Sequence, residues 1–78
     1  MKYSYEEFVA DLEMGHEIEF NVQREDYSIS HNDKGWYFSK LNSDYHTFSD
    51  VTNLLENIRI MGQTLKEMWD QVEIKSIF

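Results

Sequence analysis

The apolar positions near the N-terminus recur at the spacing of an amphipathic helix. Ser4 and Glu7 stand three residues apart, as in a capping box, and Gly15 follows as a left-handed helix stop. The pattern therefore predicts a helix between Ser4 and Gly15 with one face turned toward a core. The residues expected on that buried face are Tyr5, Phe8, Val9 and Leu12.

After this helix the apolar period changes to the alternation of a β-strand. The change predicts a three-stranded antiparallel β-meander with strands over residues 17–22, 27–31 and 36–41. The tightest first hairpin has Arg24 and Glu25 at its turn. That turn sets Val22 opposite Tyr27 and Phe20 opposite Ile29.

The second hairpin turns within residues 31–36, which have the pattern of a type I turn closed by a left-handed Gly35. This three-residue loop pairs Asn32 with Trp36, and the side-chain period then fixes the register of both strands. Further along, the expected pairs are Ser30 with Phe38 and Ile29 with Ser39.

Together the two registers sort the predicted sheet into two faces. The core face is expected to contain Ile18, Phe20, Val22, Tyr27, Ile29, His31, Tyr37, Ser39 and Leu41. The other face is expected to contain Glu17, Glu19, Asn21, Ser28, Ser30, Asn32, Trp36, Phe38 and Lys40. Two large aromatics on a polar face form an apolar patch that is typical of a partner surface. The alternative is that the N-terminal helix or the loop after Leu41 covers Trp36 and Phe38.

The chain beyond this meander continues with a polar stretch that has no periodicity. We expect a loop over residues 42–47, followed by a second helix that Ser49 or Asp50 caps. The apolar face of this helix consists of Val51, Leu54, Leu55 and Ile58.

A break at residues 61–62 separates a third predicted helix, for which Thr64 and Glu67 form a second capping box. Its apolar face consists of Leu65, Met68, Trp69 and Val72. Residues 73–78 alternate weakly and suit a short edge strand. The predicted fold class is α+β in one domain over residues 1–78, with an N-terminal helix, the meander and two C-terminal helices.

Negative charge is concentrated in the first part of the chain. The sequence has a formal net charge of -8, and six of its carboxylates against one lysine lie in the first twenty residues. Such a surface repels phosphate backbones and attracts basic partners, which disfavours direct binding of nucleic acid. Glu6 and Glu7 also favour the dipole of the N-terminal helix, so those two acids need no function.

Composition narrows the environment in which this chain works. It has no cysteine, which excludes disulfides and thiolate chemistry and suits a reducing compartment. We find neither a secretory apolar region nor an apolar run of membrane length, so we expect a cytoplasmic protein without membrane contact.

Catalytic and metal-binding patterns are weak throughout the sequence. The histidines His16, His31 and His46 form no close-spaced ligand pair, so we expect neither a metal nor another cofactor. We find no nucleophile elbow and no glycine-rich phosphate loop, and we therefore expect no enzyme. The alternative is a small metal-dependent enzyme that uses His46, Asp44 and the loop between the last strand and the second helix.

Three short stretches stand out together, namely residues 35–36, Phe48 leading into residues 54–57, and residues 62–69. With them the chain resembles, over most of its length from Tyr5 to Val72, a group of small uncharacterised α+β proteins from Gram-positive bacteria and their mobile elements. The resemblance implies a bacterial cytosolic protein with an accessory role, and it brings no assigned activity.

These observations lead to a hypothesis of binding rather than catalysis. We expect an acidic protein-binding module that inhibits or sequesters a basic protein partner, as immunity proteins, antitoxins and anti-defence proteins do. The expected partner-binding residues are Glu17, Glu19, Trp36 and Phe38. The alternative is a structural or regulatory interaction protein that forms a homodimer through Trp36 and Phe38 and is acidic only for solubility.

Overall fold

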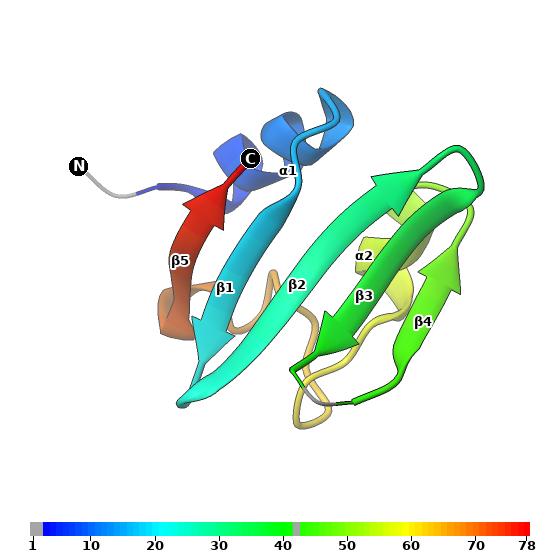
Figure 1. The fold of residues 1–78 in the computed structure, drawn as a ribbon. Coiled ribbons are helices and arrows are strands. Elements are labelled where there is room, and N and C mark those ends of the chain that lie inside the picture. The colour runs from blue at the N-terminus through cyan, green and yellow to red at the C-terminus, as the bar shows by residue number, and fades with distance from the viewer. Residues whose placement is uncertain (1–2, 42) are drawn as a thin grey trace.

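The protein is a five-stranded antiparallel sheet with its two α-helices on one side. A computed structural model describes residues 3–41 and 43–78. The strands lie in the order β4-β3-β2-β1-β5, so the last strand of the chain pairs with the first. Figure 1 shows both α1 and α2 behind the sheet, which leaves its other face without a covering layer.

Helix α1 (Tyr5–Glu13) forms where the sequence predicts it. The Ser4 hydroxyl accepts a hydrogen bond from the Glu7 amide at 3.0 Å, and both halves of the capping box are present. Phe8 and Leu12 are fully buried against the sheet. Gly15 then has a φ of 95°, as a left-handed helix stop requires.

The first hairpin joins β1 (Ile18–Val22) to β2 (Glu25–Asn32) through a turn of two residues, Gln23 and Arg24. Their φ angles of 48° and 70° belong to a type I′ turn, which suits the twist of the strands. The expected register is therefore wrong by two residues, because the structure pairs Val22 with Glu25 and Phe20 with Tyr27. A shift of two leaves every side chain on its expected face.

The second hairpin joins β2 to β3 (Gly35–Lys40), and here the expected register is wrong by one residue. The turn contains only Asp33 and Lys34, because Gly35 already pairs with Asn32. The Asn32 side-chain oxygen accepts a hydrogen bond from the Lys34 amide at 2.8 Å, which stabilises the shorter turn. A shift of one exchanges the two faces of β3, so Ile29 lies opposite Phe38 rather than Ser39.

The expected loop over residues 42–47 is partly wrong, and residue 42 lies outside the described residues. Strand β4 (Tyr45–Phe48) pairs with β3 and forms one edge of the sheet. Its backbone groups gain hydrogen-bond partners there, which local polarity does not reveal. Helix α2 (Val51–Asn57) follows, and the Asp50 side chain caps it through the Asn53 amide.

The expected third helix is the largest error of the sequence prediction. The Thr64 and Glu67 capping contacts form, but the chain makes only turns and the short 3-10 helix η1 (Trp69–Gln71). Strand β5 (Val72–Ile77) then pairs with β1. Val72, the last residue of the expected apolar helix face, therefore belongs to the sheet. The α+β class with the expected order of elements is thus corrected to five strands and two α-helices.

The core lies between the sheet and the helices. Aromatic rings fill much of it, since Phe20 packs edge-on against Phe8 and Trp69 lies 4.8 Å from Phe8 between ring centroids. The Trp69 indole N–H donates a hydrogen bond to the Tyr3 carbonyl at 3.0 Å. These contacts hold the N-terminal segment against Trp69, which lies in the short helix η1 just before the last strand.

Candidate functional site: the open face of the sheet

The candidate site is the sheet face opposite the helices, which we call the open face. The register of the strands places alternate side chains there. The open face consists of Glu19, Asn21, Asp26, Ser28, Ser30, Asn32, Tyr37, Ser39, Leu41, Tyr45, Thr47, Glu73 and Lys75. Figure 1 looks onto this face, and neither helix crosses it.

Hydroxyl and amide groups dominate the half of the open face on β2, β3 and β4. Tyr37 and Tyr45 form an aromatic pair across neighbouring strands, with ring centroids 5.4 Å apart in an edge-on arrangement. The Tyr37 hydroxyl donates a hydrogen bond to the Asn32 side-chain oxygen at 3.0 Å. Tyr45 nevertheless exposes 63% of its surface, so this pair offers a rigid ring to a partner.

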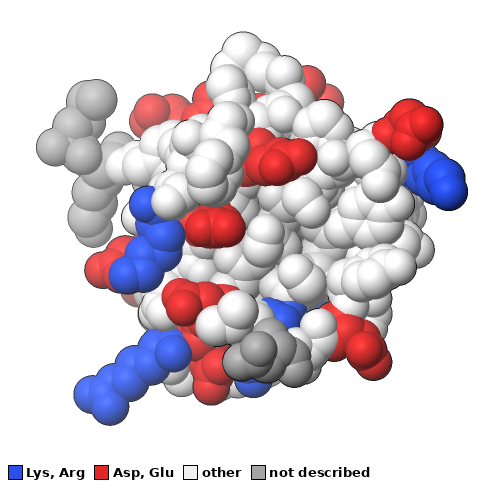
Figure 2. Space-filling view, viewed as in Figure 1, with Lys and Arg blue, Asp and Glu red and all other residues white. Residues whose placement is uncertain are grey.

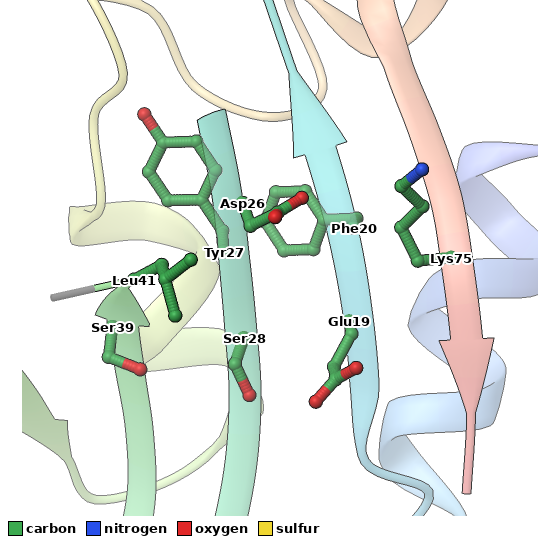
Figure 3. Close-up of a pocket in the computed structure, with 8 residues that line it drawn as sticks. All are labelled: Glu19, Phe20, Asp26, Tyr27, Ser28, Ser39, Leu41 and Lys75. Atoms are coloured by element: carbon green, nitrogen blue, oxygen red, sulfur yellow. The ribbon is translucent and has the colours of Figure 1, made fainter. Parts of the chain in front are cut away.

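A shallow depression of about 360 Å³ lies where β1, β2 and β3 run side by side on the open face. Ser28 and Ser39 line its floor, while Glu19, Asp26 and Lys75 bring charges to its margin. Figure 3 shows these side chains around the depression, with the Tyr27 ring directed away behind its strand. Leu41 adds an apolar side chain that is 64% exposed.

The charged side chains of the open face lie on its half formed by β1, β5 and the start of β2. Lys75 enters this face at the irregular point where β5 shifts its pairing with β1, and its ammonium lies 3.4 Å from a Glu73 carboxylate oxygen. The Asp26 carboxylate accepts a hydrogen bond from the side-chain amide of Asn21 at 2.9 Å. Glu19 is exposed. Figure 2 shows more acidic side chains on this half than over β3 and β4.

The four residues expected to bind a partner do not form one patch. Glu19 lies on the open face, and Glu17 directly precedes β1, where its backbone pairs with Phe78. Trp36 and Phe38 lie on the covered face, because the register of β3 differs by one from the expected one. Phe38 is only 7% exposed, so the expected exposed aromatic pair is wrong.

His31 lies beside Trp36 on the covered face of the sheet. The two rings lie 4.5 Å apart, and His31 Nε2 is 2.7 Å from the Gly15 carbonyl oxygen. His16 makes a similar contact from Nδ1 to the Phe78 carbonyl oxygen at 3.0 Å. Both imidazoles therefore hold the connection between α1 and β1 in place, which is a structural role.

Within residues 3–41 and 43–78 no three His, Asp or Glu side chains gather closely enough to hold a metal ion. The same residues include no helix that is long and apolar enough to cross a membrane. His46 and Asp44 line a groove on the covered side of the sheet rather than the open face.

Sequence reasoning missed the residues that dominate the open face. Tyr37 and Leu41 were assigned to the core by the one-residue error in β3, and Tyr45 was placed in a loop. One signal was available, since Tyr45, Thr47 and Phe48 are residues that favour strands and follow a turn region. A fourth strand would have extended the predicted sheet and shown the aromatic pair.

Comparisons with known proteins add no relative to this picture. No protein-family model, no curated protein and no solved structure matches the chain.

Proposed function

We propose that this protein is an acidic binding module that inhibits or sequesters a basic protein partner through its open face. The observation that carries the proposal is a sheet face that no helix of the described residues covers, on which the half-buried Tyr37 packs against the exposed Tyr45. The lack of cysteine suits a reducing environment, and we place its action in the cytoplasm.

The composition of the open face supports binding rather than catalysis. Tyrosine rings supply large contact area at low conformational cost, and Ser and Asn groups supply adaptable hydrogen bonds. The depression beside them is shallow and holds Glu19, Asp26 and Lys75 at its margin. A broad surface of this kind fits a protein better than a small substrate, which needs a cleft that encloses it.

Charge supports a basic partner. The whole chain has a net charge of -8, so a basic protein is attracted over several ångströms before contact. At close range, Glu19 and Asp26 lie beside the uncharged hydroxyl groups of Ser28 and Ser39. Acids at the margin thus accelerate association, while Tyr37 and Tyr45 contribute the contact area.

The experiment is affinity capture followed by quantitative binding. Immobilised protein captures partners from a bacterial lysate, mass spectrometry identifies them, and the purified partner is titrated against the protein. We expect a basic partner whose affinity for a Tyr37→Ala, Glu19→Gln double variant is about tenfold lower or worse. Affinity for the wild type should also fall as salt rises from about 0.05 to about 0.5 M.

A matched control separates the open face from general charge effects. Met14 and Glu56 are exposed elsewhere, so a Met14→Ala, Glu56→Gln variant removes the same charge and a comparable apolar area away from the open face. That control should bind the partner as the wild type does. Equal loss in both variants, or a captured partner without basic character, contradicts the proposal. Sedimentation that shows only a self-association blocked by Tyr37→Ala favours the homodimer instead.

A further inference from the structure

A second depression lies on the covered side of the sheet, at a corner that neither α1 nor α2 reaches. We call it the corner groove. It has a volume of about 540 Å³ and is lined by Tyr27, Phe38, Lys40, Ser43, Asp44, His46, Arg59, Ile60 and Met61. In Figure 1 the segment after α2 loops below the C-terminal end of β3.

The corner groove gathers positive charge in an acidic protein. Lys40 and Arg59 are two of only seven basic residues in the chain, and His46 lies on the strand beside them. Asp44 is the one acidic residue in the lining. The Lys40 ammonium lies 3.6 Å from a Glu25 carboxylate oxygen in an exposed pair, which weakens its charge only in part.

The Arg59 guanidinium is held in a fixed position at the end of α2. Its Nη1 donates hydrogen bonds to the Glu56 carbonyl at 2.7 Å and the Ile58 carbonyl at 2.9 Å. Within the described residues these bonds use one nitrogen of the group, and no carboxylate lies within ion-pair distance of it. Its charge still acts nearby, since it helps to lower the pKa of Glu67, after the Thr64 hydrogen bonds.

Aromatic rings form the inner wall of the corner groove. Tyr27 and Phe38 stack with centroids 5.6 Å apart and planes only 12° from parallel. At the outer wall Met61 has a φ of 53° in a tight turn closed by the pairing of Ile60 with Gln63. A non-glycine residue in that conformation is strained. Met61 also has 62% of its surface exposed beside the groove.

We propose that the corner groove binds a small organic anion with a flat ring, of the class of a nucleoside monophosphate. Arg59 and Lys40 would bind the phosphate oxygens, because a guanidinium offers paired N–H donors that match them. Tyr27, Ile60 and Met61 would contact the ring. The volume suits a ligand of this size. This site lies on the side opposite the open face, so it stands independently of the proposed function.

The test is a two-dimensional NMR titration of the protein with adenosine monophosphate, adenosine and inorganic phosphate as separate probes. We expect the monophosphate to shift the amide signals of residues 43–46 and 59–61, with saturation in the millimolar range or below. Adenosine and inorganic phosphate should each bind about tenfold more weakly, because each lacks half of the recognised chemistry. Arg59→Gln should weaken monophosphate binding by about tenfold or more.

The controls use the other basic residues of the chain. Arg24→Gln makes the same change of charge at the exposed turn between β1 and β2 and should leave affinity unchanged. Lys40→Gln tests the groove without altering the end of α2, and Lys34→Gln is its control in the turn between β2 and β3. Equal losses in the groove variants and their controls, no shift at the groove, or adenosine binding as tightly as its monophosphate would each overturn the proposal.

Discussion

The two faces of the sheet place neighbouring aromatic residues of β3 in a buried core and on an open surface. Phe38 is almost fully buried and stacks on Phe20 and Tyr27 on the covered face. Its neighbour Tyr37 points the other way and packs mainly against Tyr45 on the open face. One residue along a strand thus separates a core ring from a surface ring.

Burial and register, rather than residue type, therefore decide whether an aromatic side chain of β3 belongs to the core or to the surface. Trp36 and Phe38 suggest a binding patch when a three-residue turn precedes them, and a core when a two-residue turn does. Tyr37 makes the opposite exchange, from the expected core face to the open face. Four pairs of substitutions test how strictly the two faces are separated.

The largest contrast is expected between Phe38→Ala and Tyr37→Ala. Phe38→Ala removes a ring from a stack of three on the covered face, and such truncations cost about 3 to 5 kcal/mol. A domain of this size has a net stability of about that amount, so the variant should be largely unfolded at room temperature. Tyr37→Ala should remain folded and lose about 1 kcal/mol. Circular dichroism during urea denaturation measures both free energies of unfolding. Similar losses in the two variants would show that the faces are not distinct.

The next contrast concerns the glycine that fixes the register of β3. A Cβ at Gly35 would lie 2.7 Å from the Phe48 carbonyl oxygen, and the φ of 142° is already unfavourable for other residues. Gly35→Ala should therefore cost more than about 2 kcal/mol, because β4 must move away from β3. The matched control is Gly62→Ala, which meets no atom within 4 Å and should cost about 1 kcal/mol for its positive φ alone. Thermal denaturation compares them, and a milder effect at Gly35 would contradict the close approach of β4.

Sequence reasoning recovered the elements whose ends are locally encoded. Helix α1 has its Ser4 cap and Gly15 stop, and α2 has its Asp50 cap, so both helices stand where their patterns predict them. The two faces of the first hairpin were predicted correctly although its turn was not, because a register error of two residues keeps every side chain on the same face.

The errors arise where a distant part of the chain supplies the partner. Strand β4 was missed because its pairing edge is supplied by β3, whereas β5 lies at an edge of the sheet where the weak alternation over residues 73–78 predicts a short strand. Leu65 and Met68 have helical spacing and are buried as predicted, but turns place them there. The candidate site was predicted least well, because its residues depend on the length of the turn that follows Asn32. In the structure the Asn32 side chain stabilises a two-residue turn, whereas the prediction has a three-residue turn that Gly35 closes.

A smaller contrast is expected between the polar residues of the two faces. His31→Phe keeps a ring beside Trp36 but removes the donor to the Gly15 carbonyl, which should cost about 1 to 2 kcal/mol. Ser30→Ala, on the open face next to it, should stay within about 0.5 kcal/mol of the wild type. Urea denaturation at neutral pH measures both. If Ser30→Ala is the more damaging change, then the open face has a structural role that its exposure conceals.

The smallest effect is a difference in pH dependence between tyrosines on the two sides. Burial raises the pKa of Tyr3 above its ordinary value of about 10, and the Asp11 carboxylate that accepts its hydrogen bond at 2.5 Å raises it further. The folded state thus holds a proton that the unfolded chain releases above about pH 10. The resulting stability is fully present below that pH and is lost as the pH rises through the raised folded value. Urea denaturation at pH 8 and about pH 11 should show this loss in the wild type and a smaller one in Tyr3→Phe. Tyr37→Phe, which removes a phenol from the open face, is the matched control, and identical slopes for the wild type and Tyr3→Phe would contradict the coupling of Tyr3 to folding.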